Sequence, residues 1–216
     1  MHRHPSHTRI LAASLAFSAG YVDAVGFISL GGFFVSFMSG NSTRLGVGAV
    51  EAWPLAARAA ELIATFVIGV AIGTFVGERA AQRQRAVLFL VAGLLSLSAV
   101  VSDFAFPTLA AIGAALAMGA VNAVFGRDTS LPVGLTYVSG TLVRLGESLG
   151  TSWTQGPRWQ WTPYLLHWLA LVFGAAVGAA SYDQFRLNAL WAAALWTLAM
   201  ALWCHFLPAS NSDRPL

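Results

Sequence analysis

Asp23 stands in the middle of the first long apolar run of the chain, within the motif GYVDAVGF. If this run crosses a bilayer, an ionised carboxylate there costs about 2.5–3.5 kcal/mol, so it must face a partner or a water-filled cavity. Two interpretations stay open. The acid is a protonation or cation site that faces the polar segment downstream, or it pairs with Arg44 and fixes that segment. The two are compatible, because a paired acid can still exchange its proton when the partner moves away.

Two polar octapeptides, SGNSTRLG at 39–46 and SGTLVRLG at 139–146, interrupt apolar sequence in the same way. Irregular backbone survives at membrane depth only where it is buried in protein or lines a wet cavity. The glycines predict sharp turns at Gly40 and Gly140, each followed by a short helix, over about 41–53 and 140–150. Such helices expose free N–H groups and partial positive charge, which can hold polar ligand atoms. The candidate capping residues are Ser39, Asn41 and Ser42 in the first segment and Ser139 and Thr141 in the second.

The charges of the two segments differ in their surroundings. Asn122 occupies in the second half the place that Asp23 has in the first. Arg144 has Glu147 three residues on, one helical step away, whereas Arg44 has no acid there and would need Asp23. Each half can thus neutralise its own arginine, and the charge of a bound solute stays open. The predicted solute- or ion-binding residues are Asp23, Ser39, Gly40, Asn41, Ser42, Arg44, Asn122, Ser139, Gly140, Thr141 and Arg144.

Histidines offer a second kind of chemistry. His167 and His205 fall near the ends of two neighbouring predicted helices and could together bind a metal or a haem, although interfacial histidines are commonly polar anchors. His2, His4 and His7 belong to a basic N-terminal segment that we expect to be solvated. We therefore predict no metal site and no cofactor.

Enzymatic motifs are absent from the sequence. There is no P-loop, no HExxH, no Gly-x-Ser-x-Gly elbow and no cysteine pair, so we do not expect an enzyme. The single cysteine, Cys204, is expected to be a small apolar residue near a helix end. Glu61 is expected to pair with Arg58 or to reach the membrane surface.

The composition indicates whether these residues lie in water or in a membrane. Hydrophobic residues make up 57% of the 216 residues and charged residues 10%, against about 25% charged in soluble domains. The sequence therefore predicts an integral membrane protein, an all-α bundle in a single domain over 1–216, with a flexible tail at 208–216. The net charge of +3 comes from scattered arginines, which gives no reason to expect a nucleic-acid partner.

Runs of about 20 apolar residues can cross the hydrocarbon core as helices. An N-terminal cleaved signal is disfavoured, because apolar sequence continues to Met38. Whether 33–53 and 129–150 are re-entrant or spanning stays open, but the re-entrant alternative places most arginines inside and both termini in the cytoplasm. The predicted spans are 9–31, 56–78, 86–102, 107–126, 162–182 and 187–207.

The two halves of the chain, about 9–102 and 107–207, resemble each other. GYVDAV in the first half matches GAVNAV in the second, and Gly69 and Gly73 match Gly174 and Gly178. Three crossings per half would place the halves in opposite orientations, an inverted repeat common among secondary transporters. The glycines, with Gly77, predict close helix packing and no chemistry.

GYVDAVGF, FMSGNSTRLG, GAVNAVF and VSGTLVRLG together resemble the motifs of the YoaK-type family of bacterial inner-membrane proteins. That family has a Gly-x-x-Asp-Ala helix followed by a Thr-Gly-Asn turn, where this chain has Ser39 in place of the threonine. The resemblance covers nearly the whole chain. It implies a multi-span plasma-membrane protein and supplies neither substrate nor catalytic residue.

From these features we predict a small transporter or permease for a small polar solute. The alternatives are an intramembrane metal- or haem-binding oxidoreductase and a structural or regulatory membrane subunit. A homodimer would use the glycine ridges or the tryptophan-rich last helix as its contact.

Overall fold

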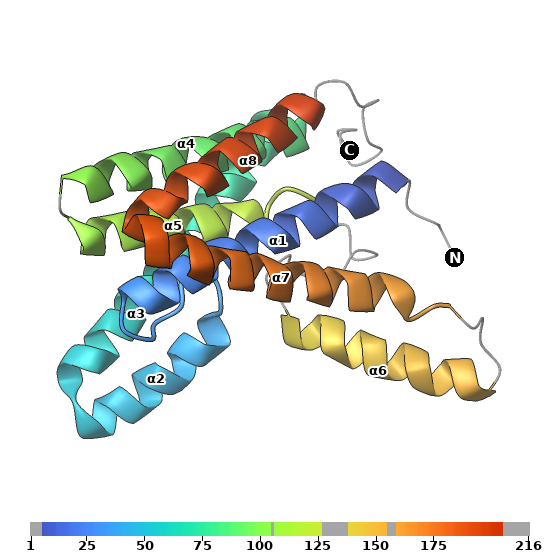
Figure 1. Ribbon diagram of the computed structural model, residues 1–216, viewed down its shortest axis with the longest axis horizontal. Helices are drawn as coiled ribbons and strands as arrows, with labels where there is room; N and C mark the ends of the chain where they lie inside the picture. Colours follow the sequence, from blue (N-terminus) through green and yellow to red (C-terminus); the bar gives the residue numbers. More distant parts are fainter. Residues whose placement is uncertain (1–5, 105, 127–137, 155–158, 205–216) are drawn as a thin grey trace.

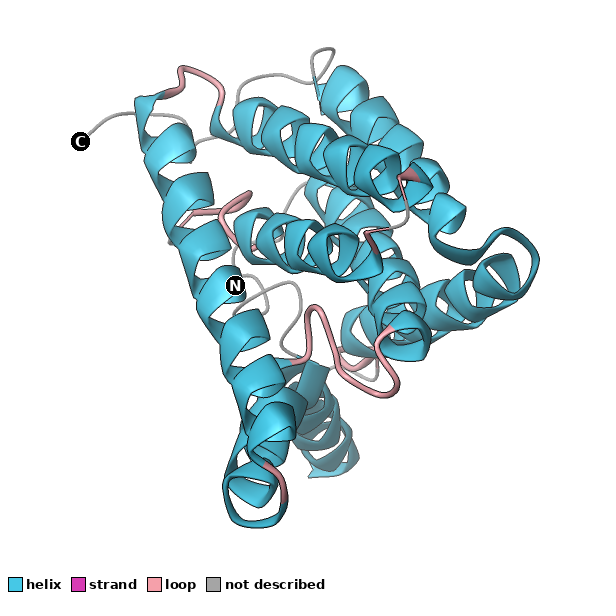
Figure 2. Cartoon of the chain, turned by 90° about the vertical axis from the view of Figure 1, so that its left-hand side faces the viewer, coloured by secondary structure: helices cyan, strands magenta, loops and turns pink. Residues whose placement is uncertain are grey.

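The computed structural model describes residues 6–104, 106–126, 138–154 and 159–204 (Figure 1). This described part is helical, with short connecting loops and no strand (Figure 2). The elements are α1 Ser6–Ser29, α2 Met38–Glu51, α3 Trp53–Arg79, α4 Arg83–Asp103, α5 Pro107–Val121, α6 Val138–Thr154, α7 Thr162–Phe185, the 3₁₀ turn η1 Arg186–Ala189, and α8 Leu190–Trp203.

Four stretches of the described chain are long and apolar enough to cross a membrane: Thr8–Ser29, Trp53–Arg79, Arg83–Asp103 and Thr162–Trp203. The helical membrane class is confirmed, whereas the number of six spans is not. The last stretch contains the predicted span 162–182 and most of the predicted span 187–207, and α5 in the predicted span 107–126 is a shorter apolar helix of 15 residues. The last stretch joins α7, η1 and α8, with a break at Arg186, whose φ is 53°. The predicted helix over 107–126 is too long, because 122–126 form turns with i→i+3 hydrogen bonds. The end of the predicted sixth span lies outside the described residues.

Helices α1 and α7 touch through their backbones. A Cβ placed at Gly174 would collide with the carbonyl oxygen of Phe17, and one at Gly178 with that of Tyr21. A Cβ at Gly20 would collide with the carbonyl of Leu171. Because the contacts advance along both helices together, α1 and α7 run parallel, as Figure 1 shows.

Helices α3 and α5 meet in the same way. A Cβ at Gly69 would collide with the carbonyl oxygen of Leu116, one at Gly73 with that of Ala120, and one at Gly119 with that of Phe66. These helices are also parallel. The predicted close packing of the glycine ridges is thus confirmed, and it takes place within the chain.

The positions of these glycines bear on the predicted homodimer. Gly69 and Gly73 are covered by α5, Gly174 and Gly178 by α1, and Gly77 lies against Arg83 at the start of α4. The ridges are therefore covered within the chain, and the homodimer stays a prediction, with the tryptophan-rich last helix as the contact that this packing leaves to it.

The core of the described part lies where α4 packs between α5 and α8, with α1 in contact with both α5 and α8. Its largest fully buried side chains include Leu88, Leu95, Leu15 and Met118. On the outside, α3, α7 and α8 present large aliphatic and aromatic side chains, as a lipid-facing surface requires. These exposed side chains include Val67, Ile68, Phe75, Phe173, Leu195 and Leu202.

Candidate functional site

The chain turns back on itself directly after α1. Gly31 and Gly32 have positive φ angles of 64° and 102°, which only glycine adopts without strain. They end α1 and open the segment 30–37, which we name the returning loop. Gly26, one turn before the end of α1, lies against the side chain of Val35, so the loop runs back along the helix. The predicted continuation of the first helix to residue 31 misses this turn.

Asp23 holds the returning loop. Its Oδ1 accepts hydrogen bonds from the backbone N–H groups of Val35 and Ser36, both at 2.8 Å. The predicted ion pair with Arg44 is absent: Asp23 binds main-chain donors instead. These donors belong to irregular backbone, which has no ladder or helix of its own to satisfy it.

Asn41 holds the same loop from the other side. Its Oδ1 accepts from the N–H of Phe34 at 3.1 Å, and its Nδ2 donates to the carbonyl of Phe34 at 2.7 Å. The side chain is 0% exposed. Asp23 and Asn41 thus provide hydrogen-bond partners for the main-chain groups of three consecutive residues, 34–36. Asn41 therefore holds the returning loop and is not the predicted helix cap.

Gly40 has a different role from the predicted turn. Helix α2 begins at Met38, so Gly40 lies in its first turn and has no positive φ. A Cβ there would come within 2.9 Å of the rings of Phe34 and Phe37. The ring centroids of these phenylalanines are 5.1 Å apart, and Phe27 lies 4.8 Å from Phe34. The glycine makes room for this aromatic cluster.

The hydroxyl groups of α2 do not cap it either. The residue before α2, Phe37, receives no side-chain cap. Ser42 donates to the carbonyl of Met38 at 2.8 Å, and Thr43 to that of Ser39 at 3.3 Å, one turn back in each case. Ser39 and Ser42 are exposed. The predicted capping function of this motif is wrong, because the helix starts at Met38, one to four residues before the three candidates.

In the second half, α6 begins at Val138, so Ser139, Gly140 and Thr141 lie in its first turn. The segment 127–137 that precedes it lies outside the described residues. Thr141 is 1% exposed and takes the place of the equally buried Asn41. Asn122, at the end of α5, donates to the carbonyl of Met118 at 2.8 Å.

The two polar segments have the same pattern of burial. Over 38–47 and 138–147, each residue falls in the same class, exposed, half-buried or buried, as its counterpart. The pattern includes Arg44 and Arg144, which are both half-buried. The sequence similarity that singled out these segments is therefore matched by their local packing.

Neither arginine forms its predicted ion pair. The guanidinium of Arg44 lies 5.1 Å from the ring centroid of Phe33. Arg144 makes no ion pair with Glu147, whose side chain points to the exposed face of α6. Within the described residues, the two half-buried cations have no carboxylate partner.

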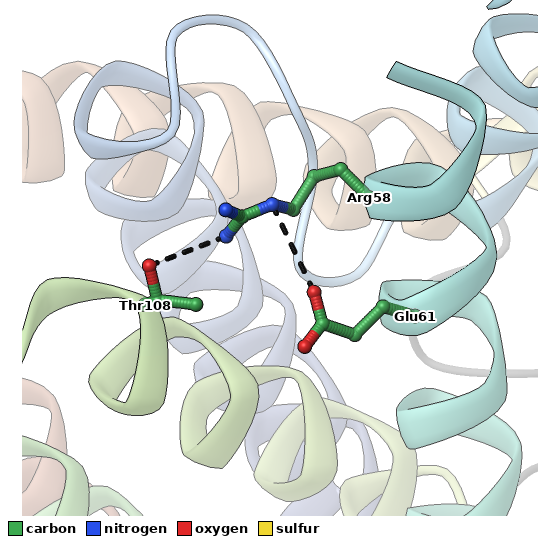
Figure 3. A network of polar contacts seen from close by, with 3 residues as sticks. All are labelled: Arg58, Glu61 and Thr108. Atoms are coloured by element: carbon green, nitrogen blue, oxygen red, sulfur yellow. Dashed lines mark hydrogen bonds and ion pairs between the residues drawn. The ribbon is translucent and has the colours of Figure 1, made fainter. Parts of the chain in front are cut away.

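Arg58 and Glu61 do pair, as predicted. Arg58 Nε lies 3.8 Å from Glu61 Oε2, and Arg58 Nη1 donates to Thr108 Oγ1 at 3.4 Å (Figure 3). The group is partly exposed and ties the start of α3 to the start of α5. It is a surface contact of the helix ends.

The predicted metal or haem site at His167 and His205 lies partly outside the described residues. His167 is buried in α7, while His205 and the N-terminal His2 and His4 lie outside the described residues, as does the side chain of His7. Among the described residues, no group of three or more His, Cys, Asp or Glu could hold a metal. Cys204 is buried directly after α8, as expected for a small residue near a helix end.

This molecule is an integral membrane protein of the all-helical class. It has long apolar helices and an apolar outer surface, and its polar side chains Asp23 and Asn41 bind irregular backbone. The chain belongs to the family described as Protein of unknown function (DUF1275), whose profile matches residues 11–203. It is 39% identical over 211 residues to a UPF0700 transmembrane protein of Rhizobium meliloti (strain 1021), with 94% of this chain and 89% of the relative covered. No solved structure matches the chain. These findings confirm the resemblance predicted from the motifs.

Proposed function

We propose that this membrane protein is a small secondary transporter or permease, which moves a small polar solute across the bacterial inner membrane. The observation that carries the proposal is the pair of short helices α2 and α6, with their matched burial over 38–47 and 138–147. Broken or short helices that start inside the bundle are the usual site of solute binding in transporters built from repeats.

The short helices are re-entrant in this proposal. Helix α2 has 14 residues and is therefore about 21 Å long, less than the roughly 30 Å of the hydrocarbon core. It packs back against α3 as a hairpin, with Gly48 against the backbone of Ala56. A chain that enters and leaves by one face requires this geometry.

The glycine crossings support an inverted repeat of three crossings per half. Helix α1, the first of the first half, runs parallel to α7 of the second half. Helix α5, the first of the second half, runs parallel to α3 of the first half. If α2 and α6 are re-entrant, α3 opposes α1 and α7 opposes α5. Helices α1 and α5 then point in opposite directions, which is the relation that an inverted repeat demands.

The direction of the helices agrees with this arrangement. In Figure 1, α2 runs from the middle of the molecule to the left and α6 from the middle to the right, while α1 starts and α8 ends toward the right. The two short helices would therefore reach the centre from opposite faces, with both termini of the bundle on one face. The excess of arginine on the side of 79–85 favours the cytoplasm for that face.

The site residues take distinct roles in this proposal. Asp23 and Asn41 keep the returning loop in place, so that α2 can begin inside the bundle. Ser39 and Ser42 on α2, and Ser139 on α6, are exposed hydroxyls available to a polar solute. No catalytic step and no cofactor is part of the proposal.

Osmotic swelling of proteoliposomes tests the proposal. Purified protein is reconstituted, and light scattering follows the entry of neutral polyols, amino acids, and potassium or sodium salts. We expect at least one solute to enter faster than in empty liposomes. Ser42→Trp, on the exposed face of α2, should slow that entry, whereas the control Val50→Trp at the outer end of the same helix should not. Equal rates with and without protein for every solute would refute transport.

A further inference from the structure

The arginines of the two short helices lie at equivalent places. Arg44 and Arg144 are each the seventh residue of their helix, and both are half-buried. The residues around them, from 38 to 47 and from 138 to 147, share one pattern of exposure. A cation is therefore built into the same position of both halves.

Both arginines lie about two turns or more before the C-terminal ends of their helices. Arg44 precedes Glu51 by seven residues and Arg144 precedes Thr154 by ten, which corresponds to roughly 10 Å and 15 Å of helix. Exposed tryptophans mark the outer ends, as expected at a membrane interface: Trp53 is 75% exposed and Trp153 85%. The guanidinium groups start from backbone that lies deeper than these rings.

Among the described residues, the two carboxylates predicted to neutralise the arginines do not pair with them. Asp23 binds the N–H groups of Val35 and Ser36. Glu147 is exposed and makes no ion pair with Arg144, and the ion pair that the described residues do form, Arg58 with Glu61, is at the start of α3. The guanidinium of Arg44 lies beside Gly32 of the returning loop and 5.1 Å from the ring centroid of Phe33, and among the described residues it forms no ion pair.

An arginine at membrane depth is costly unless it meets an opposite charge or water. A guanidinium presents a planar fork of N–H donors that fits the oxygens of a carboxylate or another oxyanion. We propose that the solute carried by this protein is a small oxyanion, bound through Arg44 on one side of the bundle and through Arg144 on the other. This inference rests on the proposed function and names its substrate class.

Anion binding is tested on purified protein, independently of flux. Tryptophan fluorescence is titrated with sodium acetate, nitrate, sulfate and phosphate at constant ionic strength in sodium chloride, with choline chloride and glycerol as cationic and neutral probes. We expect saturable binding of at least one oxyanion and none of choline or glycerol. Arg44→Gln and Arg144→Gln should each raise its Kd about tenfold or more, the loss that one charge-assisted hydrogen bond implies.

Arg79→Gln is the matched control. Arg79 also stacks on an aromatic ring, with its guanidinium 3.6 Å from the centroid of Phe75, but it lies at the end of α3. Its removal should leave the Kd unchanged. Because a variant can fail to fold, each is first required to elute as a single species of wild-type size, and Arg44→Lys, which keeps the charge, should retain more of the affinity than Arg44→Gln.

The outcomes separate this inference from the proposed function. Oxyanion binding that both arginine variants lose upholds the binding of an oxyanion through Arg44 and Arg144; if no solute then swells proteoliposomes, transport alone is refuted. Swelling by a neutral or cationic solute, with no saturable oxyanion binding, overturns the inference and leaves transport standing. Equal Kd values in wild-type and both arginine variants overturn it as well.

Discussion

Asp23→Leu removes the acceptor that holds the returning loop against α1. The two N–H groups of Val35 and Ser36, each 2.8 Å from Oδ1, are then left in apolar surroundings without a partner. A buried donor without its hydrogen bond costs about 1–3 kcal/mol, so the variant should lose about 2–6 kcal/mol of stability.

Asp23→Asn is the informative comparison. The amide oxygen has nearly the same position and can accept both hydrogen bonds, but without the negative charge. Bonds to a charged group contribute about 1.5–3 kcal/mol and neutral ones about 0.5–1.5, so the loss should be about 1 kcal/mol per bond. We therefore expect Asp23→Asn to unfold at a temperature between those of the wild type and Asp23→Leu.

The unfolding temperature is followed by tryptophan fluorescence in detergent, with the elution volume of each variant as a check of its fold. Arg44→Leu in the Asp23→Asn background is the control. Because Asp23 does not pair with Arg44, the double variant should recover no stability. A recovery, or an unchanged unfolding temperature in Asp23→Leu, would refute the assignment of Asp23 to the returning loop.

Further outcomes are expected from the same assays and from labelling. Gly174→Leu should prevent correct packing of α1 on α7, whereas Gly146→Leu, which has open space around its Cα, should change the unfolding temperature little; comparable losses in both would contradict the crossing. Glu61→Gln should cost less than about 1 kcal/mol, as partly exposed ion pairs do, and a larger loss would show that the pair is more than a surface contact. In a Cys204→Ser background, a cysteine at Gln82 should react only from the cytoplasm and one at Gln184 only from outside; labelling of both from one face would overturn the inverted repeat.

Much of the helical plan could be predicted from residue types. The glycines of α3 and α7 recur every four residues, a period that identifies a packed face. The structure places backbone of a neighbouring helix against Gly69, Gly73, Gly174 and Gly178, and side chains of α4 against Gly77. Long apolar runs located α1, α3, α4 and α7 to within a few residues, because helix ends in this chain coincide with changes in polarity.

The partners of the polar residues could not be predicted in the same way. Asp23 and Asn41 bind main-chain groups of residues 34–36. Because main-chain groups are alike in nearly all residues, the sequence does not indicate which of them a polar side chain binds. Pairing by side-chain charge therefore pointed to Arg44 and was wrong. A local signal did exist: the adjacent glycines at 31 and 32 are typical of a turn, but their apolar neighbours concealed it.

The crossing of α1 with α7 has a consequence for biosynthesis. Helix α1 is made before the other described helices, and its glycine face packs on α7, more than 140 residues later. At about 5–20 residues per second, Gly174 is synthesised roughly 10–30 seconds after Gly20. During that interval α1 lies in the bilayer or beside the insertion machinery without its main partner. Helix α1, the earliest made of the described helices, is thus among the last of them to be packed.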